Sequence, residues 1–239
     1  RAKAMGFDTD NVMYHGTDAS NITEFRIGGQ SVEGRHGNLF GIGVYTTKDG
    51  YTASSYAQGF DDSQTIYTLY LRGKHFDATS TDILSGDEAA SINNYLNTQI
   101  PNGDRARIIG DAGGSRKTAI FDTEKDVEDF YENQLKNWKA FDGFSRTEPE
   151  FGEGFSVEYT DFNALVDVNG LTKKDFANAL QHAGGGTITD VLKNSNFDGI
   201  SFSNQTVTFD PSNIRSVNAA FDPDLIDSPN LRYSMTDGV

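Results

Sequence analysis

Two blocks of strand-like sequence, one near each end of the chain, frame a long middle segment with a different pattern. The first block covers residues 12–76 and the second residues 196–220, and both hold short β-branched or aromatic runs bounded by glycine and asparagine. From about 78 to 195 the apolar spacing near 3.6 residues predicts helices. The two blocks together are expected to form a β-rich core that the middle segment interrupts. We expect a single α+β domain at 1–220, with a mostly helical insert at about 78–195 and an extended surface tail at 221–239.

The individual elements follow from the same patterns. We expect strands at 12–17, 22–27, 42–46, 65–71, 199–203 and 206–210, and helices at 50–58, 87–99, 124–140, 172–182 and from 187 onward. Thr172 and Thr187 are expected helix N-caps, and Asp190 follows Thr187 at the capping-box spacing. The segments 28–43 and 141–156 hold too many glycines for regular structure, so we expect a mobile flap and a loop.

Composition excludes several classes of partner. A net charge of −15 argues against tight, non-specific binding of DNA or RNA, which needs clustered Lys and Arg. The general explanation of that charge is solubility, and the more specific explanation is a basic protein partner. No apolar run approaches a membrane span, and with no cysteine the chain has neither disulfides nor thiolate metal ligands. His36, His75 and His182 lack metal-ligand spacing, so we expect no metal site. The absence of a leader after Arg1 indicates an excised domain or a processed fragment.

Two tyrosines carry the strongest chemical signal. Tyr45 ends an expected strand, and Tyr56 follows eleven residues later in the expected helix. A strand, turn and helix in this order can place two aromatic rings on either side of a flat cationic heterocycle such as nicotinamide. Upstream, His15 and the backbone of the neighbouring Gly16 could hold a ribose and a carboxamide. Taken singly, His15 and Tyr45 are also ordinary strand residues and Gln205 an ordinary surface residue, and these readings stay open.

The order of the motifs resembles a known family. Residues 15–17 (His-Gly-Thr), 41–45 (Gly-Ile-Gly-Val-Tyr), Tyr56 and 204–209 (Asn-Gln-Thr-Val-Thr-Phe) look like the ADP-ribosyltransferase fold. The likeness is closest to the diphtheria-toxin and poly(ADP-ribose) polymerase branch, which has a His, Tyr, Glu triad on three core strands. Residues 209–223 also resemble ADP-ribosyltransferase domains of phage and polyvalent mobile-element proteins. The resemblance covers the two core blocks and none of the insert.

The resemblance implies a split β-sandwich of two packed, mostly antiparallel sheets around a cleft for NAD. It implies that Tyr14, His15, Gly16, Thr17, Arg35, Tyr45, Ser54 and Tyr56 bind NAD, and that His15, Tyr45 and Gln205 are catalytic. In these roles His15 bonds the adenosine-side ribose, the Gly16 backbone pairs with the nicotinamide amide, and the two tyrosines sandwich the nicotinamide. The branch often has a serine three residues before its second tyrosine; that position is Ala53 here, next to Ser54. The flap would close over the dinucleotide, where Arg35 or His36 could meet the pyrophosphate.

The third triad position departs from the branch, because Gln205 stands where Glu is usual. A carboxylate stabilises the oxocarbenium-like state formed when the N-glycosidic bond breaks, and an amide carries no charge. At about 4 Å and an effective dielectric near 20, the lost charge is worth up to roughly 4 kcal/mol, on the order of a thousandfold in rate.

The expected activity is mono-ADP-ribosyl transfer from NAD to a macromolecular target, with release of nicotinamide and a rate weakened at Gln205. The chain would act in a bacterial or host cytoplasm as part of a larger phage or secreted protein, with a protein acceptor as partner. A catalytically silent NAD-binding module and an NAD glycohydrolase are the alternatives. A competing branch of the fold that modifies arginine uses a Ser-Thr-Ser strand and a Glu-x-Glu turn. Residues 79–81 and 148–150 match it poorly.

Overall fold

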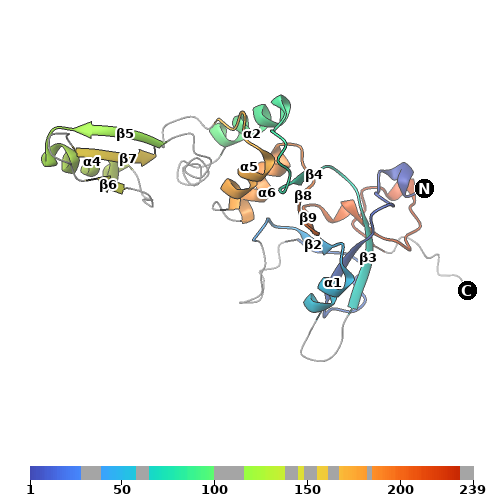
Figure 1. Ribbon diagram of the computed structural model, residues 1–239. Helices are drawn as coiled ribbons and strands as arrows, with labels where there is room; N and C mark the ends of the chain where they lie inside the picture. The colour runs from blue at the N-terminus through green and yellow to red at the C-terminus, as the bar shows by residue number, and fades with distance from the viewer. Residues whose placement is uncertain are drawn as a thin grey trace, which may run out of the picture. The chain divides into compact units, whose positions relative to one another are not determined.

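The computed structural model describes residues 1–27, 39–57, 65–99, 116–137, 145–147, 155–160, 167–181 and 185–231. Its contacts divide the chain into two compact units (Figure 1). The first comprises residues 1–82, 172–174 and 184–239, and the second residues 83–171 and 175–183. The second unit lies within the segment expected as an insert.

The first unit is built on a seven-stranded sheet with the order β10-β3-β1-β2-β9-β8-β4. Its strands are β1 (Met13–Thr17), β2 (Val44–Thr47), β3 (Thr65–Leu71), β4 (His75–Asp77), β8 (Gly199–Phe202), β9 (Gln205–Thr208) and β10 (Ile214–Ser216). Neighbouring strands are antiparallel, except that β4 and β8 are parallel. The expected α+β class is confirmed, and strands from both ends of the chain alternate in one sheet. All seven strands belong to this one hydrogen-bonded sheet, so the split sandwich stays a prediction.

Two helices belong to the first unit: α1 (Gly50–Tyr56) and α6 (Gly185–Asn194). Asp49 caps α1, since its carboxylate accepts hydrogen bonds from the backbone N–H groups of Tyr51 and Thr52 at 3.1 and 3.0 Å. The expected cap at Thr187 is wrong, because α6 begins two residues earlier and Thr187 lies in its first turn.

Helix α1 packs directly on β1 at Gly16. A Cβ built on Gly16 would lie 1.7 Å from the carbonyl oxygen of Ala53, so only a residue without a side chain allows this approach. Gly16 is therefore a packing requirement of the fold, whatever its backbone also binds.

A cluster of buried side chains covers the other face of the sheet at β1, β2, β3 and β10. Its members are Met13, Phe25, Val44, Leu69, Leu71, Ile214 and Leu231. Leu231 comes from the segment expected as a surface tail, and Phe221 is also buried, so this expectation is wrong for the described part of the tail. Arg215 anchors the same segment: its buried guanidinium donates to the carbonyl oxygens of Leu225 and Ile226, both at 3.1 Å. The expected strand at 22–27 is wrong as well, since it forms one isolated bridge, between Glu24 and Asn230.

The second unit contains α2 (Gly86–Thr98), α4 (Glu124–Asn137), most of α5 (Lys173–Gln181) and a three-stranded sheet. The sheet has the order β5-β7-β6 and is made of β5 (Arg116–Phe121), β6 (Ser145–Thr147) and β7 (Phe155–Thr160). Helices make up most of the described regular structure of the expected insert, but its three-stranded sheet was not expected. The expectation of a loop at 141–156 is wrong where this segment holds β6 and the start of β7. Phe130 of α4 contacts Phe121 of β5 with ring centroids 5.1 Å apart. Within the described residues, none of the helices is long and apolar enough to cross a membrane.

The close approach of α1 to β1 predicts a large effect from one methyl group. Gly16→Ala should lower the free energy of unfolding by about 2–3 kcal/mol, because the added carbon overlaps Ala53 unless the helix shifts. Gly50→Ala is the matched control at the start of the same helix: an added Cβ meets nothing within 4 Å, so its effect should stay within about 1 kcal/mol. Urea unfolding of the two variants measures the difference. Equal stabilities would contradict this packing.

Candidate functional site

Strands β1 and β2 separate just where the sequence places the candidate site. β1 pairs with β3 over five successive residues, and β2 pairs with β9 over four. Between β1 and β2 the described register holds the single pair Tyr14 with Thr47. We call the parted region, residues 15–17 of β1 and 43–45 leading into β2, the strand seam. Backbone groups at such a seam are placed to bond an inserted ligand in place of a neighbouring strand.

His15 bridges the seam. Its Nδ1 lies 2.7 Å from the carbonyl oxygen of Tyr45, and because a carbonyl only accepts, Nδ1 carries the proton. Burial lowers the pKa of His15, and the bond to Tyr45 opposes that shift only in part. The ring is therefore neutral at neutral pH, and Nε2 keeps a lone pair that accepts a hydrogen bond. Phe25 fixes the ring from the side, edge to face, with centroids 4.8 Å apart.

A hollow of about 400 Å³ opens at the seam. It is lined by His15, Ile22, Glu24, Phe25, Arg26, Gly43, Val44 and Tyr45. A hollow of this size can take one part of a small ligand, with a few polar groups for orientation. The neutral imidazole, one carboxylate and one guanidinium supply those groups. We call it the seam hollow.

The ring of Tyr45 lies on the opposite face of the sheet from the ring of His15. Residues paired between antiparallel strands point to the same face of the sheet, and side chains alternate between the two faces along each strand. Because Tyr14 pairs with Thr47, the side chains of Thr47 and Tyr45 lie on the face of Tyr14, and the side chain of His15 lies on the other face. The Tyr45 hydroxyl donates to the carbonyl oxygen of Gly41 at 2.9 Å and accepts from the Phe40 N–H at 3.1 Å. Tyr45 thus holds the turn that precedes β2, and its backbone carbonyl is what meets His15.

Gln205 shares the face of Tyr45. It pairs with Thr47, and Tyr45 pairs with Val207, so Gln205 and Tyr45 are diagonal neighbours on adjacent strands, roughly 7–8 Å apart. The side chain of Gln205 is half-buried and has no hydrogen-bond partner among the described residues. Helix α1 packs on this same face at Gly16. The structure therefore gathers Tyr45, Gln205 and α1 on one side of the sheet, and a ligand that also reaches His15 has to pass through the seam.

The remaining expected residues have varied places. Tyr56 ends α1 and is 54% exposed, so its ring is open to a ligand; a closed sandwich with Tyr45 stays a prediction. The Ser54 hydroxyl donates a hydrogen bond to the carbonyl oxygen of Tyr51, and the Thr17 hydroxyl accepts one from the Ala19 N–H. Tyr14 lies in the single β1–β2 pair. The expected flap residues Arg35 and His36 lie outside the described residues.

Sequence reasoning missed a clamp on the turn before β2. Thr189 of α6 accepts a hydrogen bond from the Ile42 N–H at 2.6 Å, and its hydroxyl has the carbonyl oxygens of Ile42 and Gly185 within reach. Gly43 lies against β9: a Cβ there would come within 2.5 Å of the Thr208 carbonyl oxygen. The turn that forms one wall of the seam is thus fixed from α6 and β9. No local signal marks Thr189, since its partner is 147 residues away.

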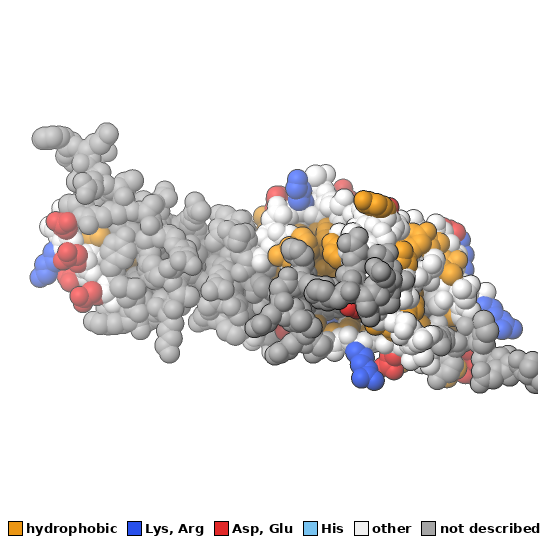
Figure 2. All heavy atoms as spheres, turned by 90° about the horizontal axis from the view of Figure 1, so that it is seen from below, with side chains coloured by type: hydrophobic (Ala, Val, Ile, Leu, Met, Phe, Trp, Pro, Cys, Tyr) orange, Lys and Arg blue, Asp and Glu red, His pale blue; other side chains and the backbone are white. Residues whose placement is uncertain are grey.

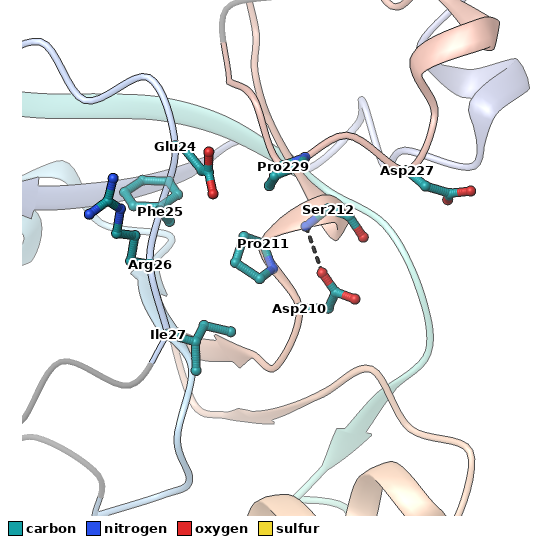
Figure 3. Close-up of a pocket in the computed structure, with 9 residues that line it drawn as sticks. All are labelled: Glu24, Phe25, Arg26, Ile27, Asp210, Pro211, Ser212, Asp227 and Pro229. Carbon is teal, nitrogen blue, oxygen red and sulfur yellow. Dashed lines mark hydrogen bonds between the residues drawn. The ribbon is translucent and has the colours of Figure 1, made fainter.

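A second hollow, of about 600 Å³, lies between residues 24–27, 210–212 and 227–229 (Figure 3). It carries three carboxylates, of which Asp210 accepts from the Ser212 N–H at 2.8 Å and Asp227 pairs with Arg72 at 3.0 Å. Two of its acids are thus engaged in local structure. We call it the acidic hollow.

In comparisons with known proteins, no family model, curated protein or solved structure matches the chain. Within the described residues, no group of three or more His, Asp or Glu side chains is placed to hold a metal ion. On the face drawn in Figure 2 the described Lys and Arg side chains lie scattered. The case for a function rests on the geometry of the seam.

The buried histidines predict a loss of stability on mild acidification. Burial lowers the pKa values of His15 and His75 below 6.5, so the unfolded chain takes up these protons first. The free energy of unfolding should therefore fall as the pH drops below about 6.5, before the carboxylates titrate. His15→Asn keeps an N–H for the Tyr45 carbonyl but does not titrate, so this variant should lose part of the dependence between pH 6.5 and 5. Identical pH profiles of unfolding would contradict the neutral, buried state of His15.

Proposed function

We propose that the chain is an NAD-dependent mono-ADP-ribosyltransferase that modifies a macromolecular target, most simply a protein. The observation that carries the proposal is that β1, β2 and β9, which hold His15, Tyr45 and Gln205, are three neighbouring strands of one sheet, with the strand seam between the first two. The resemblance to ADP-ribosyltransferases implies a triad on three core strands, and the placement of these residues on three adjacent strands supports the proposal. The split-sandwich fold of that family is part of the same proposal.

The groups at the seam suit two separate parts of NAD. The neutral Nε2 of His15 accepts from a hydroxyl of the adenosine-side ribose, while the parted backbone around Gly16 pairs with the nicotinamide carboxamide. On the other face, the rings of Tyr45 and Tyr56 offer aromatic surface to the cationic nicotinamide. In the reaction, the bond between the nicotinamide nitrogen and ribose C1′ breaks, and nicotinamide leaves as a neutral molecule with the bonding electron pair. A nucleophile of the target then bonds C1′ and loses its proton.

Gln205 sets the rate in this scheme. Its amide oxygen can accept a ribose hydroxyl, but it places no negative charge beside the developing cation. The half-buried, uncharged Gln205 also favours a second candidate function, a catalytically silent NAD-binding module. With water as the acceptor, the same site would be an NAD glycohydrolase.

The substitution Gln205→Glu separates these functions. It should raise the rate of nicotinamide release by up to about a thousandfold, because a carboxylate near C1′ stabilises the oxocarbenium-like state. Gln205→Met, of similar size and without charge, is the control and should show no gain. The measurement is nicotinamide release from NAD, with radiolabelled NAD and a cell lysate supplying acceptors.

The fate of the label decides among the candidates. Label on a lysate protein supports the transferase, and free ADP-ribose with no labelled protein supports the glycohydrolase. Saturable NAD binding without release in either form of residue 205 supports the silent module. Absence of NAD binding to the unaltered chain contradicts all three.

A further inference from the structure

We propose that Arg26 binds the diphosphate of the dinucleotide in the seam hollow. This inference rests on the proposed function and adds a binding residue to it. The sequence-based assignment of the diphosphate to Arg35 concerns a residue outside the described part of the chain, whereas Arg26 lines the seam hollow together with His15.

The charge around the site makes a cation necessary. The chain carries a net charge of −15, and the acidic hollow beside the seam hollow contains the carboxylates of Glu24, Asp210 and Asp227. A diphosphate with two negative charges is repelled by such surroundings unless a local cation offsets them. Among the residues that line the two hollows, Arg26 is the one Lys or Arg, and it lines both.

The guanidinium of Arg26 is available for a ligand. Arg26 is exposed, and it has no ion-pair partner among the described residues. Figure 3 shows the side chains of Glu24 and Arg26 on opposite sides of their segment. A guanidinium presents paired N–H donors that match phosphate oxygens, which makes arginine the side chain suited to this contact.

The segment that presents Arg26 is held firmly on both sides. Phe25 is buried in the core cluster and packs against the His15 ring, and the Ile22 N–H donates to the Tyr67 hydroxyl at 2.7 Å. The Leu231 N–H donates to the Thr23 carbonyl oxygen at 2.7 Å. Since Phe25 is the immediate neighbour of Arg26, the same anchor sets the His15 ring and the starting point of the guanidinium. Because His15 and Arg26 line the same hollow, one ligand can offer a ribose to His15 and a phosphate to Arg26.

The test compares ligands with and without phosphates on matched variants. Arg26→Gln should lower the affinity for NAD and for ADP-ribose about tenfold or more, because a charge-assisted hydrogen bond is lost. The affinity for nicotinamide riboside, which has no phosphate, should change by no more than about twofold. Lys48→Gln removes the same charge from an exposed position that lines neither hollow, so it should leave all three affinities nearly unchanged. Arg26→Lys should recover part of the loss for NAD. Calorimetric titration measures the affinities, and equal thermal midpoints confirm that the variants are folded.

The possible results separate this inference from the proposed function. A selective loss for the two diphosphate ligands in Arg26→Gln supports the role of Arg26. If Arg26→Gln binds NAD as tightly as the unaltered chain, the role of Arg26 is overturned while the proposed function stands. The role of Arg26 is also overturned if the variant loses as much affinity for nicotinamide riboside as for NAD. If the unaltered chain binds neither NAD nor nicotinamide riboside, the proposed function falls, and this inference falls with it.

Discussion

The hydrogen bond from the His15 imidazole to the Tyr45 carbonyl joins two strands at the point where their backbones stop pairing. An ordinary antiparallel ladder would fill this position with backbone bonds and leave no room for a ligand. Here the side chain takes the place of a ladder bond, and the same bond fixes which ring nitrogen holds the proton. The position of the ring and the acceptor at Nε2 follow from this one contact, while burial keeps the ring neutral against the opposing effect of the bond.

Packing around the seam keeps it parted. On one wall, α1 lies so close to Gly16 that no side chain fits, which fixes β1 against the helix. On the other wall, Thr189 holds Ile42, and Gly43 presses on the carbonyl oxygen of Thr208. Each wall is thus attached to its own support, and the backbone groups that face the seam are left for a ligand. A site built in this way is present before a ligand arrives.

Local sequence patterns predicted the strands that carry the site, but not how the strands meet. The β-branched and aromatic runs around His15, Tyr45 and Gln205 predicted β1, β2 and β9 because alternation and turn residues act over a few positions. The single pair between β1 and β2 is a matter of register between distant segments, and no local pattern encodes it. Thr189 was missed for the same reason. The strands β6 and β7 were missed because glycines among their neighbours outweighed short β-prone runs.

The central claim is that NAD enters the sheet between β1 and β2. The most direct measurement is a map of backbone amide chemical-shift changes as NAD is titrated into the ¹⁵N-labelled chain. The account predicts saturable changes that are largest at residues 15–17 and 43–45 and weaker at residues 210–212 of the acidic hollow. Changes centred on the acidic hollow, or no saturable change at the seam, would contradict it.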